Sequence, residues 1–193
     1  MKTYDHELEL GFEVSAAQAI KIITREHCLI THQDIIYQIW LEEGEVGGYK
    51  FRTRIRKTEN MRSDLRGSWV NLSGSWDGKY EFTTKYSKSD ETAAEQDNME
   101  LNTKITLEEY QKLKKIYEAA GKEEVMKIRT YFRTPLDPFT TYTLDTYPDE
   151  EGDRARIEIE FVNKEEMDRW KAPNWLKELI GSNKVSNAEE TGE

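Results

Sequence analysis

Charged and apolar residues alternate with a period of two along most of the extended segments of this chain. In segment 154–161, Arg154, Arg156, Glu158 and Glu160 share one face, and apolar side chains occupy the other. Such alternation is typical of a β-strand with one polar and one apolar face. Together with one apolar run, the alternating segments predict eight strands: 5–14, 35–41, 49–57, 79–86, 99–105, 125–133, 140–147 and 154–161.

Helical signals lie between and after these strands. Ser15 is placed to cap a first helix, and Thr106 with Glu109 forms a capping box before a second. Pro173 separates the last two helices, because proline cannot continue a helix. The predicted helices cover residues 16–27, 107–121, 164–170 and 174–180.

The remaining segments are connections and a tail. Segment 58–78 is expected to be a long connection with a small hairpin around Trp69, forming either a lid over a site or a hairpin packed on the outside. Segment 87–98 is expected to be an acidic surface loop. Length and the lack of a linker favour one domain over residues 1–181, followed by a flexible acidic tail over 182–193.

The charged faces are ordered by type, with Arg and Lys rows on some strands and Glu pairs on others. A sheet with one solvated face explains any single strand but not this ordering across the whole set. We therefore predict an α+β fold in which a closed eight-stranded antiparallel β-tunnel keeps a hydrophilic interior and is flanked by helices. Burying these charges is costly unless they pair or bind something, so a ligand is expected.

Composition narrows the classes of partner. The chain has 193 residues, with 28 Lys and Arg against 38 Asp and Glu, and a net charge of −10. This acidity disfavours non-specific binding to nucleic acids or anionic membranes. No apolar run is long enough to span a membrane, and the N-terminus lacks the apolar core of a secretory signal. With the lone Cys28, these features favour a cytoplasmic protein, which can be a monomer or a homodimer.

Two Glu-x-Glu pairs carry the first candidate chemistry. Glu7 with Glu9, and Glu158 with Glu160, place two carboxylates on one face of their strands. Converging carboxylates repel each other unless a cation joins them, and Mg²⁺ or Mn²⁺ prefers such oxygen ligands. Salt bridges to neighbouring Arg and Lys residues are the alternative interpretation.

A second group of side chains provides positive charge for binding phosphate. Guanidinium forks match phosphate oxygens, and Lys adds point charges. Basic and acidic rows together indicate a polyphosphate held by protein cations on one side and by metal on the other, with in-line attack of metal-activated water on a terminal phosphoryl group. A solvated surface is the alternative for a basic strand alone. The cations are Arg52, Arg54, Arg56, Lys85, Lys127 and Arg129.

Taken in order, these motifs resemble those of the CYTH, or triphosphate tunnel metalloenzyme, family, which includes inorganic triphosphatases, thiamine triphosphatases and class IV adenylate cyclases. The match runs from residue 5 to about residue 187. It consists of Glu7-Leu-Glu9, Asp34-Ile-Ile-Tyr37, the strand FRTRIRK, Thr83-Thr84-Lys85, Glu100, Lys127-Ile128-Arg129, Asp145, the closing pair Glu158 and Glu160, and Pro173-Asn174-Trp175-Leu176.

The resemblance implies a Mg²⁺- or Mn²⁺-dependent hydrolase of tripolyphosphate, of a nucleoside or thiamine triphosphate, or of an RNA 5′-triphosphate. A class IV type adenylate cyclase and a non-catalytic tunnel that sequesters a phosphorylated ligand remain alternatives. The implied roles are metal binding by Glu7, Glu9, Glu100, Asp145, Glu158 and Glu160, phosphate binding by the six cations above, and catalysis by Glu7, Glu9 and Lys85.

The chain departs from the family pattern at two positions. Gly11 stands where the family usually has a lysine that assists catalysis, and Asn102 stands where a second acidic residue is often found. Losing a positive charge beside the substrate would slow hydrolysis, change the substrate, or leave a binding protein.

Overall fold

The computed structural model describes most of the chain. The described residues are 2–63, 69–71, 78–88, 95–148 and 153–181. Within these ranges, the side chains of residues 2–7, 62–63, 69–71 and 95–97 lie outside the description. The predicted tail, 182–193, falls outside it as well, and so does Trp76.

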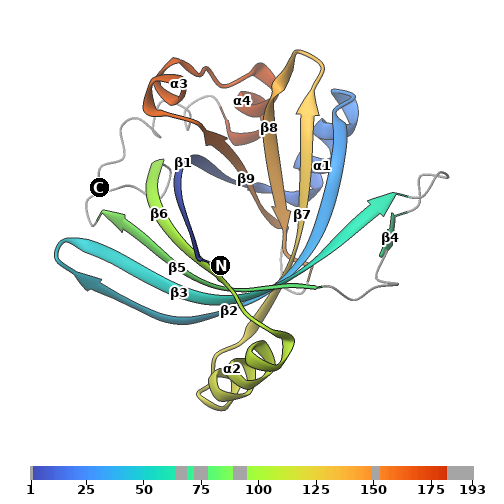
Figure 1. Cartoon of the computed structure of the whole chain (residues 1–193). Coiled ribbons are helices and arrows are strands. Elements are labelled where there is room, and N and C mark those ends of the chain that lie inside the picture. The colour runs from blue at the N-terminus through green and yellow to red at the C-terminus, as the bar shows by residue number, and fades with distance from the viewer. Residues whose placement is uncertain (1, 64–68, 72–77, 89–94, 149–152, 182–193) are drawn as a thin grey trace.

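In the described part of the chain, nine strands form one antiparallel sheet, and eight of them close into a barrel (Figure 1). The order around the barrel is β2-β7-β8-β9-β1-β6-β5-β3, and β3 pairs back with β2. The short β4 extends the sheet beyond β3. The strands are β1 (Lys2–Ser15), β2 (Leu29–Val46), β3 (Tyr49–Ser63), β4 (Trp69–Asn71), β5 (Lys79–Lys88), β6 (Glu95–Lys104), β7 (Glu124–Thr134), β8 (Asp137–Thr146) and β9 (Arg154–Phe161).

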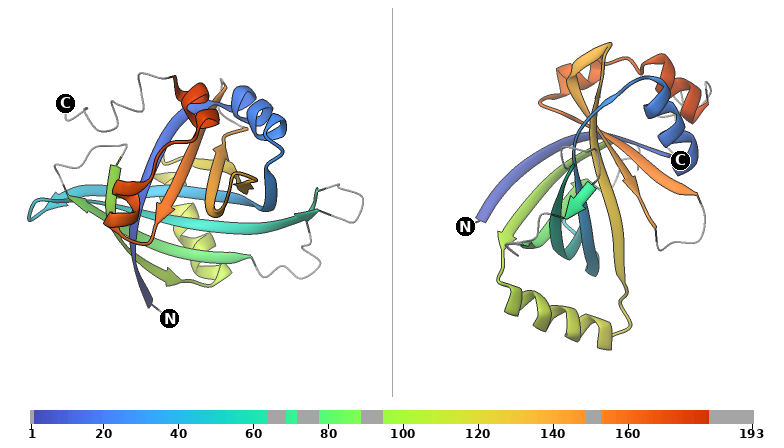
Figure 2. Two further views of the ribbon diagram at one scale, coloured as in Figure 1. Left: turned by 90° about the horizontal axis from the view of Figure 1, so that it is seen from above. Right: turned by 90° about the vertical axis from the view of Figure 1, so that its right-hand side faces the viewer.

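Helices lie on the outside of the barrel (Figures 1 and 2). The predicted caps are present: the Ser15 hydroxyl accepts from Gln18 N, and Thr106 with Glu109 forms the capping box. No helix in the described part of the chain is long and apolar enough to cross a membrane. The helices are α1 (Ala16–Arg25), α2 (Leu107–Ala119), α3 (Lys164–Arg169) and α4 (Asn174–Ile180).

The hydrophobic cores lie between the barrel and these helices rather than inside the barrel. One core joins the outer faces of β1, β7, β8 and β9 to α1, α3 and α4. Trp175 of α4 packs in it against the rings of Phe132 and Tyr142. A smaller core joins β2, β3 and β5 to α2 around Ile55 and Tyr110. Apolar burial therefore stabilises the outer surface of the sheet and leaves the inner surface to polar side chains.

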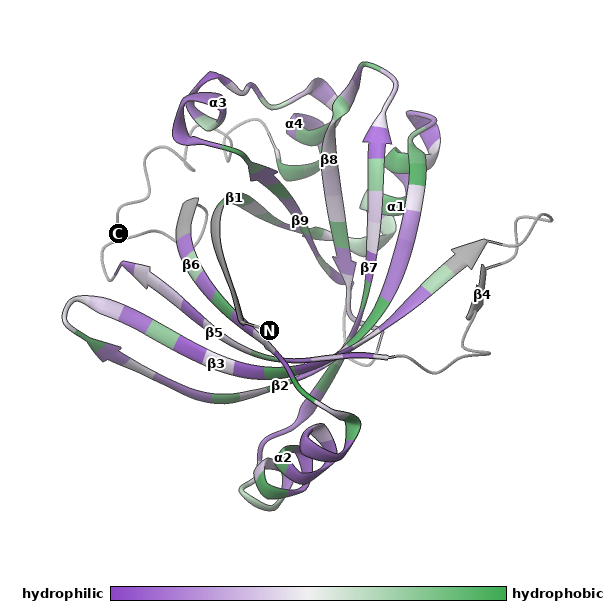
Figure 3. Cartoon of the chain, in the orientation of Figure 1, coloured by the Kyte–Doolittle hydropathy of each residue, from purple (hydrophilic) through white to green (hydrophobic). Residues whose placement is uncertain are grey.

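Period-two alternation assigns the two faces of the strands as predicted. In β9, Ile157 and Ile159 are fully buried on the outer face. Arg156 and Glu158, which alternate with them, line the interior. Figure 3 shows the same mixture of hydrophilic and hydrophobic residues along the strands. The expected closed antiparallel tunnel with a hydrophilic interior is confirmed.

Two predicted connections are shorter in the structure. Strand β3 continues to Ser63, and its end pairs with β4, which forms the small hairpin expected around Trp69. Strand β6 already begins at Glu95, inside the predicted acidic loop. Apart from Met61, both extensions consist of polar residues, so the apolar half of the alternating signal is almost absent there.

Candidate functional site

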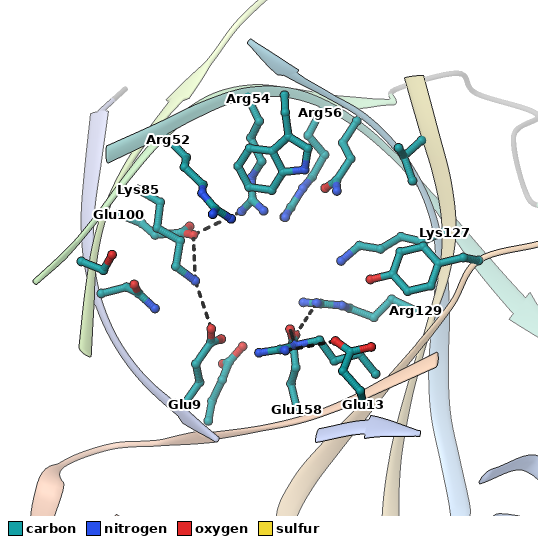
Figure 4. A pocket seen from close by; sticks show the side chains of 18 of the residues that line it. Glu9, Glu13, Arg52, Arg54, Arg56, Lys85, Glu100, Lys127, Arg129 and Glu158 are labelled. Atoms are coloured by element: carbon teal, nitrogen blue, oxygen red, sulfur yellow. Dashed lines mark hydrogen bonds and ion pairs between the residues drawn. The ribbon is translucent and has the colours of Figure 1, made fainter. Parts of the chain in front are cut away.

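A cavity of about 610 Å³ runs inside the barrel (Figure 4). Among the described residues, ten Lys and Arg side chains and five Glu side chains line it, an excess of five positive charges in a protein whose net charge is −10. Such a local excess attracts anions. The cations are Lys50, Arg52, Arg54, Arg56, Lys85, Lys88, Lys127, Arg129, Arg154 and Arg156.

Three arginines of β3 form a basic wall, composed of Arg52, Arg54 and Arg56 (Figure 4). They share one face because they are two residues apart on a strand. The Nη2 of Arg54 lies 3.2 Å from Glu100 Oε1, and its guanidinium carbon lies 5.3 Å from the ring centroid of Trp40. Arg54 is therefore held by an ion pair and an aromatic ring.

Arg56 differs from Arg54 in having no ion pair among the described residues, whereas the buried Nε of both arginines has no hydrogen-bond partner there. Burial lowers the pKa of this guanidinium from 12.5 to about 10, and the charges of Arg54 and Arg129 contribute to the shift. An uncompensated buried cation is costly. An anion bound beside Arg56 would remove this cost.

The opposite side of the tunnel is an acidic wall, composed of Glu9 and Glu13 of β1 and Glu158 and Glu160 of β9. Glu9 is the register partner of Glu160 on the neighbouring strand. Burial raises the pKa of Glu160, and the charges of Glu9 and Glu158 add to the rise although Arg129 opposes it. Glu160 forms no ion pair or hydrogen bond through its side chain with any other described residue. A cation between Glu9 and Glu160 would stabilise both.

A dense ion-pair cluster connects the walls, formed by Lys127, Arg129, Asp145 and Glu158. Arg129 donates to both Asp145 oxygens at 2.7 Å and to Glu158 Oε2 at 2.6 Å. Lys127 Nζ lies 2.5 Å from Asp145 Oδ2. Asp145 has no exposed surface and lies behind the cavity lining. The cluster thus anchors β7 to β8 and β9.

Titration of these groups reflects their burial and their partners. Burial lowers the pKa of Lys127 to about 8, and Arg129 adds to this shift although Asp145 opposes it. Burial also disfavours the ionised form of Asp145, but Arg129 and Lys127 hold its pKa well below the usual range. Burial also disfavours the charged form of Arg129, but the Asp145 carboxylate outweighs burial and raises the Arg129 pKa above its usual value. The cluster therefore stays charged at neutral pH.

Lys85 bridges the acidic wall and β6. Its Nζ lies 3.1 Å from Glu9 Oε1 and 3.8 Å from Glu100 Oε1. Asn102 donates to Glu100 Oε2 at 3.4 Å, so this amide supports a carboxylate. Glu100 is shared by Arg54, Lys85 and Asn102 and is almost fully buried.

The structure brings all six predicted phosphate-binding cations into the cavity lining. Among the predicted metal ligands, Glu9, Glu100, Glu158 and Glu160 line it, whereas Asp145 does not. The side chain of Glu7 lies outside the described part. No three His, Cys, Asp or Glu side chains in the described ranges form a group that could hold a metal ion. The metal set and the catalytic roles of Glu7, Glu9 and Lys85 stay predictions.

Several lining residues were not singled out from the sequence. Arg156 shares the face of Glu158, so period two alone was a signal for it. Gln38 was the one polar residue in the apolar run 35–41 apart from the Tyr37 hydroxyl. Trp40 and Tyr147 also line the cavity, and an aromatic residue in a strand gives no local sign of facing a polar interior.

Asp34 of β2 is buried, and its Oδ1 has no hydrogen-bond partner among the described residues. Burial raises the pKa of this carboxyl from 3.8, although His32 and Tyr131 oppose the shift. The folded state therefore binds more protons than the unfolded state above pH 3.8. Stability is lost as the pH rises from 3.8 through the raised folded pKa.

We expect Asp34→Asn to raise the free energy of unfolding at pH 7 by on the order of 1 kcal/mol, because it removes an ionised group that is poorly solvated. The gain should vanish below pH 3.8, where Asp34 is protonated in both states. Urea denaturation at both pH values measures this. Asp168→Asn, on the exposed surface of α3, is the control. A gain that grows in acid would contradict this account.

The closed antiparallel barrel, its charged interior and its outer helices together define a tunnel fold. HpAC1 from Hippeastrum, described as a putative adenylyl cyclase with a dominant triphosphatase activity, matches with a TM-score of 0.51. It is 10% identical, and the match covers 95% of this chain and 87% of that chain. This chain therefore has a CYTH-like fold, as the order of its motifs predicted.

Other solved structures match with lower TM-scores. Inorganic triphosphatase NE1496 is 15% identical with a TM-score of 0.42, over 88% of this chain and 85% of that chain. The PH1012 protein from Pyrococcus horikoshii OT3 is 16% identical with a TM-score of 0.49, over 84% of each chain. No family model and no curated protein matches the sequence.

Proposed function

We propose that this protein binds a triphosphate-bearing anion in the tunnel and hydrolyses its terminal phosphoryl group with the help of Mg²⁺ or Mn²⁺. The observation that supports this most directly is Arg56. It is a buried guanidinium without an ion pair among the described residues, in a cavity with five excess positive charges. Several linked phosphates would supply the compensating negative charge. The CYTH-like fold is consistent with this proposal.

The basic wall and the acidic wall would have different roles in binding such a ligand. Guanidinium groups of the basic wall bind non-bridging phosphate oxygens in pairs. Lys85 of β5 pairs with Glu9 of β1, two strands away around the barrel, and Arg129 pairs with Glu158. The ligand would lie between the walls, where charges interact more strongly than in open water.

The acidic wall has the donor chemistry that a hard divalent cation requires. Glu9 and Glu160 would hold it, because they are register partners with carboxylate oxygens and because burial and neighbouring negative charge destabilise ionised Glu160. Glu158 stands beside them but is bound to Arg129 and Arg156. When bound, the metal would supply a Lewis acid that activates water and neutralises charge on the phosphate.

A binding protein without turnover is the second candidate. It is favoured by the lack of a three-ligand metal group within the described ranges and by Gly11, where the family pattern has a lysine. A cyclase of the class IV type would use the same cations but release pyrophosphate and a cyclic nucleotide. Products therefore distinguish the three functions.

We expect phosphate release from tripolyphosphate or ATP in Mg²⁺ or Mn²⁺, and none in excess chelator. Glu160→Gln should abolish this activity because it removes a metal-ligand charge at nearly constant volume. The variant should also lose the rise in melting temperature that Mg²⁺ or Mn²⁺ gives the wild type. Separation of the products and thermal melting measure the two effects.

Glu165→Gln is the matched control, because Glu165 is exposed on α3 and does not line the tunnel. It should keep both activity and the metal-induced rise. Full activity of Glu160→Gln, or activity in chelator, would overturn the metal assignment. Tight binding of tripolyphosphate with no product would favour the binding protein, and cyclic nucleotide would favour the cyclase.

A further inference from the structure

Because Gly11 has no side chain, it leaves space on the inner face of β1, and a side chain from another strand occupies that space. A Cβ atom placed on Gly11 would lie 2.0 Å from Nη2 and 2.4 Å from Cζ of Arg156. Both distances are far below van der Waals contact, so any other residue at this position would displace the guanidinium. Arg156 belongs to β9, next to β1 in the barrel. Its guanidinium thus lies directly over the glycine.

Arg156 is tied to the acidic wall by two of its nitrogens. Its Nε donates to Glu158 Oε1 at 2.9 Å, and its Nη1 donates to Glu13 Oε1 at 3.3 Å. Nη2, the atom nearest to Gly11, has no hydrogen bond to any described residue. Since a guanidinium has five N–H donors, donors remain for a further acceptor.

The position of Nη2 places these donors among carboxylates. Glu9, Gly11 and Glu13 share one face of β1, because they are two residues apart on a strand. The guanidinium over Gly11 therefore lies in the row between Glu9 and Glu13, and it lines the cavity. Lys85 pairs with Glu9 and Arg154 pairs with Glu13 at the two ends of this row, and Arg156 is the cation that lies between them, over Gly11.

We propose that Arg156 is the anion-binding cation of the acidic wall, and that Gly11 is the residue that admits it. This inference rests on the proposed function and assigns it a further binding residue. A linear polyphosphate would meet arginine on both walls, Arg56 on β3 and Arg156 on β9. The cation that the family pattern places at the Gly11 position of the first strand is here supplied by Arg156 of the last strand.

The test is a double-mutant cycle on binding of tripolyphosphate in excess chelator, measured by titration calorimetry. Arg156→Ala should weaken binding about tenfold, as expected for the loss of one charge-assisted contact. Gly11→Ala should weaken it as well, because its methyl group displaces the guanidinium. In the Arg156→Ala background, Gly11→Ala should have no further effect, since nothing remains over the glycine.

The variants are chosen so that folding does not obscure the result. Without Arg156, Glu158 keeps Arg129 at 2.6 Å and Glu13 keeps Arg154 at 3.2 Å. If Arg156→Ala still failed to fold, Gly11→Ala would carry the test, because it retains every charge. Gly11→Lys combined with Arg156→Ala returns a cation to the same region from β1 and should recover part of the affinity.

Arg25→Ala is the control, because Arg25 also pairs with two carboxylates, Glu26 and Glu178, but outside the tunnel. It should bind tripolyphosphate like the wild type. Unchanged affinity in Arg156→Ala, with binding still weakened by Arg56→Met, would overturn this inference and leave the proposed function standing. Additive effects in the cycle would overturn the role of Gly11. Absence of binding by the wild type in chelator would overturn this inference, and absence of binding in Mg²⁺ as well would overturn the proposed function.

Discussion

Arg56→Met is expected to weaken the binding of tripolyphosphate by about tenfold to a hundredfold and, at the same time, to stabilise the free protein. Affinity falls because a charge-assisted contact worth roughly 1.5–3 kcal/mol is lost. Stability rises, by on the order of 2 kcal/mol, because burial and two neighbouring arginines lower the pKa of Arg56 to about 10. That destabilisation is fully present at pH 7, below the folded pKa, and methionine removes it while filling much of the same volume.

Arg54→Met provides the matched comparison on the same strand face. Arg54 is paired with Glu100, so its loss would leave that buried carboxylate with Lys85 at 3.8 Å. Stability should therefore fall, opposite in sign to Arg56→Met. Titration calorimetry with tripolyphosphate and urea denaturation measure both quantities. If Arg56→Met destabilised the protein and left affinity unchanged, Arg56 would be a structural residue rather than a ligand-binding one.

Asp145→Ala should be strongly destabilising, lowering the free energy of unfolding by about 3–5 kcal/mol. It leaves Lys127 buried without the carboxylate that lies 2.5 Å from it, and it removes both Asp145 contacts of Arg129. Arg129 keeps Glu158, so the cluster is weakened rather than abolished. Urea denaturation in excess chelator measures the loss.

The exposed Asp168 of α3 gives the control, and Asp168→Ala should change stability by less than about 0.5 kcal/mol. The same experiment separates two roles for Asp145. If Asp145 served only as a metal ligand, its removal would cost little stability in chelator and would abolish the stabilisation by added Mg²⁺ or Mn²⁺. That outcome would contradict a structural role for this carboxylate.

The strands and the inner face of the tunnel were predictable because both depend on local spacing. Arg52, Arg54 and Arg56 must share a face in any extended strand, and the apolar residues between them need cover. Because so many strands carry a charged face, the apolar residues were predicted to point outward and to pack against helices. The predicted N-caps Ser15 and Thr106 are confirmed, because helix capping depends on residues within a single turn.

Pairing between side chains was not predictable, because it depends on strand order and register. The sequence alone predicts the same phosphate-binding role for Arg54, Arg56 and Arg129. In the structure Arg54 and Arg129 are bound to carboxylates from other strands, and Arg56 has no such partner among the described residues. Likewise, Asp145 was grouped with the other acids, yet the barrel places it behind the lining. The residues that form these ion pairs are 16 to 46 positions apart in the sequence, so local spacing does not predict them.

Because both hydrophobic cores lie outside the barrel, most strand residues contribute either to packing or to the tunnel interior, in alternation. Substitutions on the inner face leave the apolar contacts that hold helices to sheet untouched. The cavity lining is thus separated from the packing by the thickness of a single strand. A scaffold of this kind can acquire a new arrangement of interior charges by changes at inward positions alone. Redesign of the interior charge should therefore begin at residues 38, 40, 52 and 156, which line the cavity while the cores remain intact.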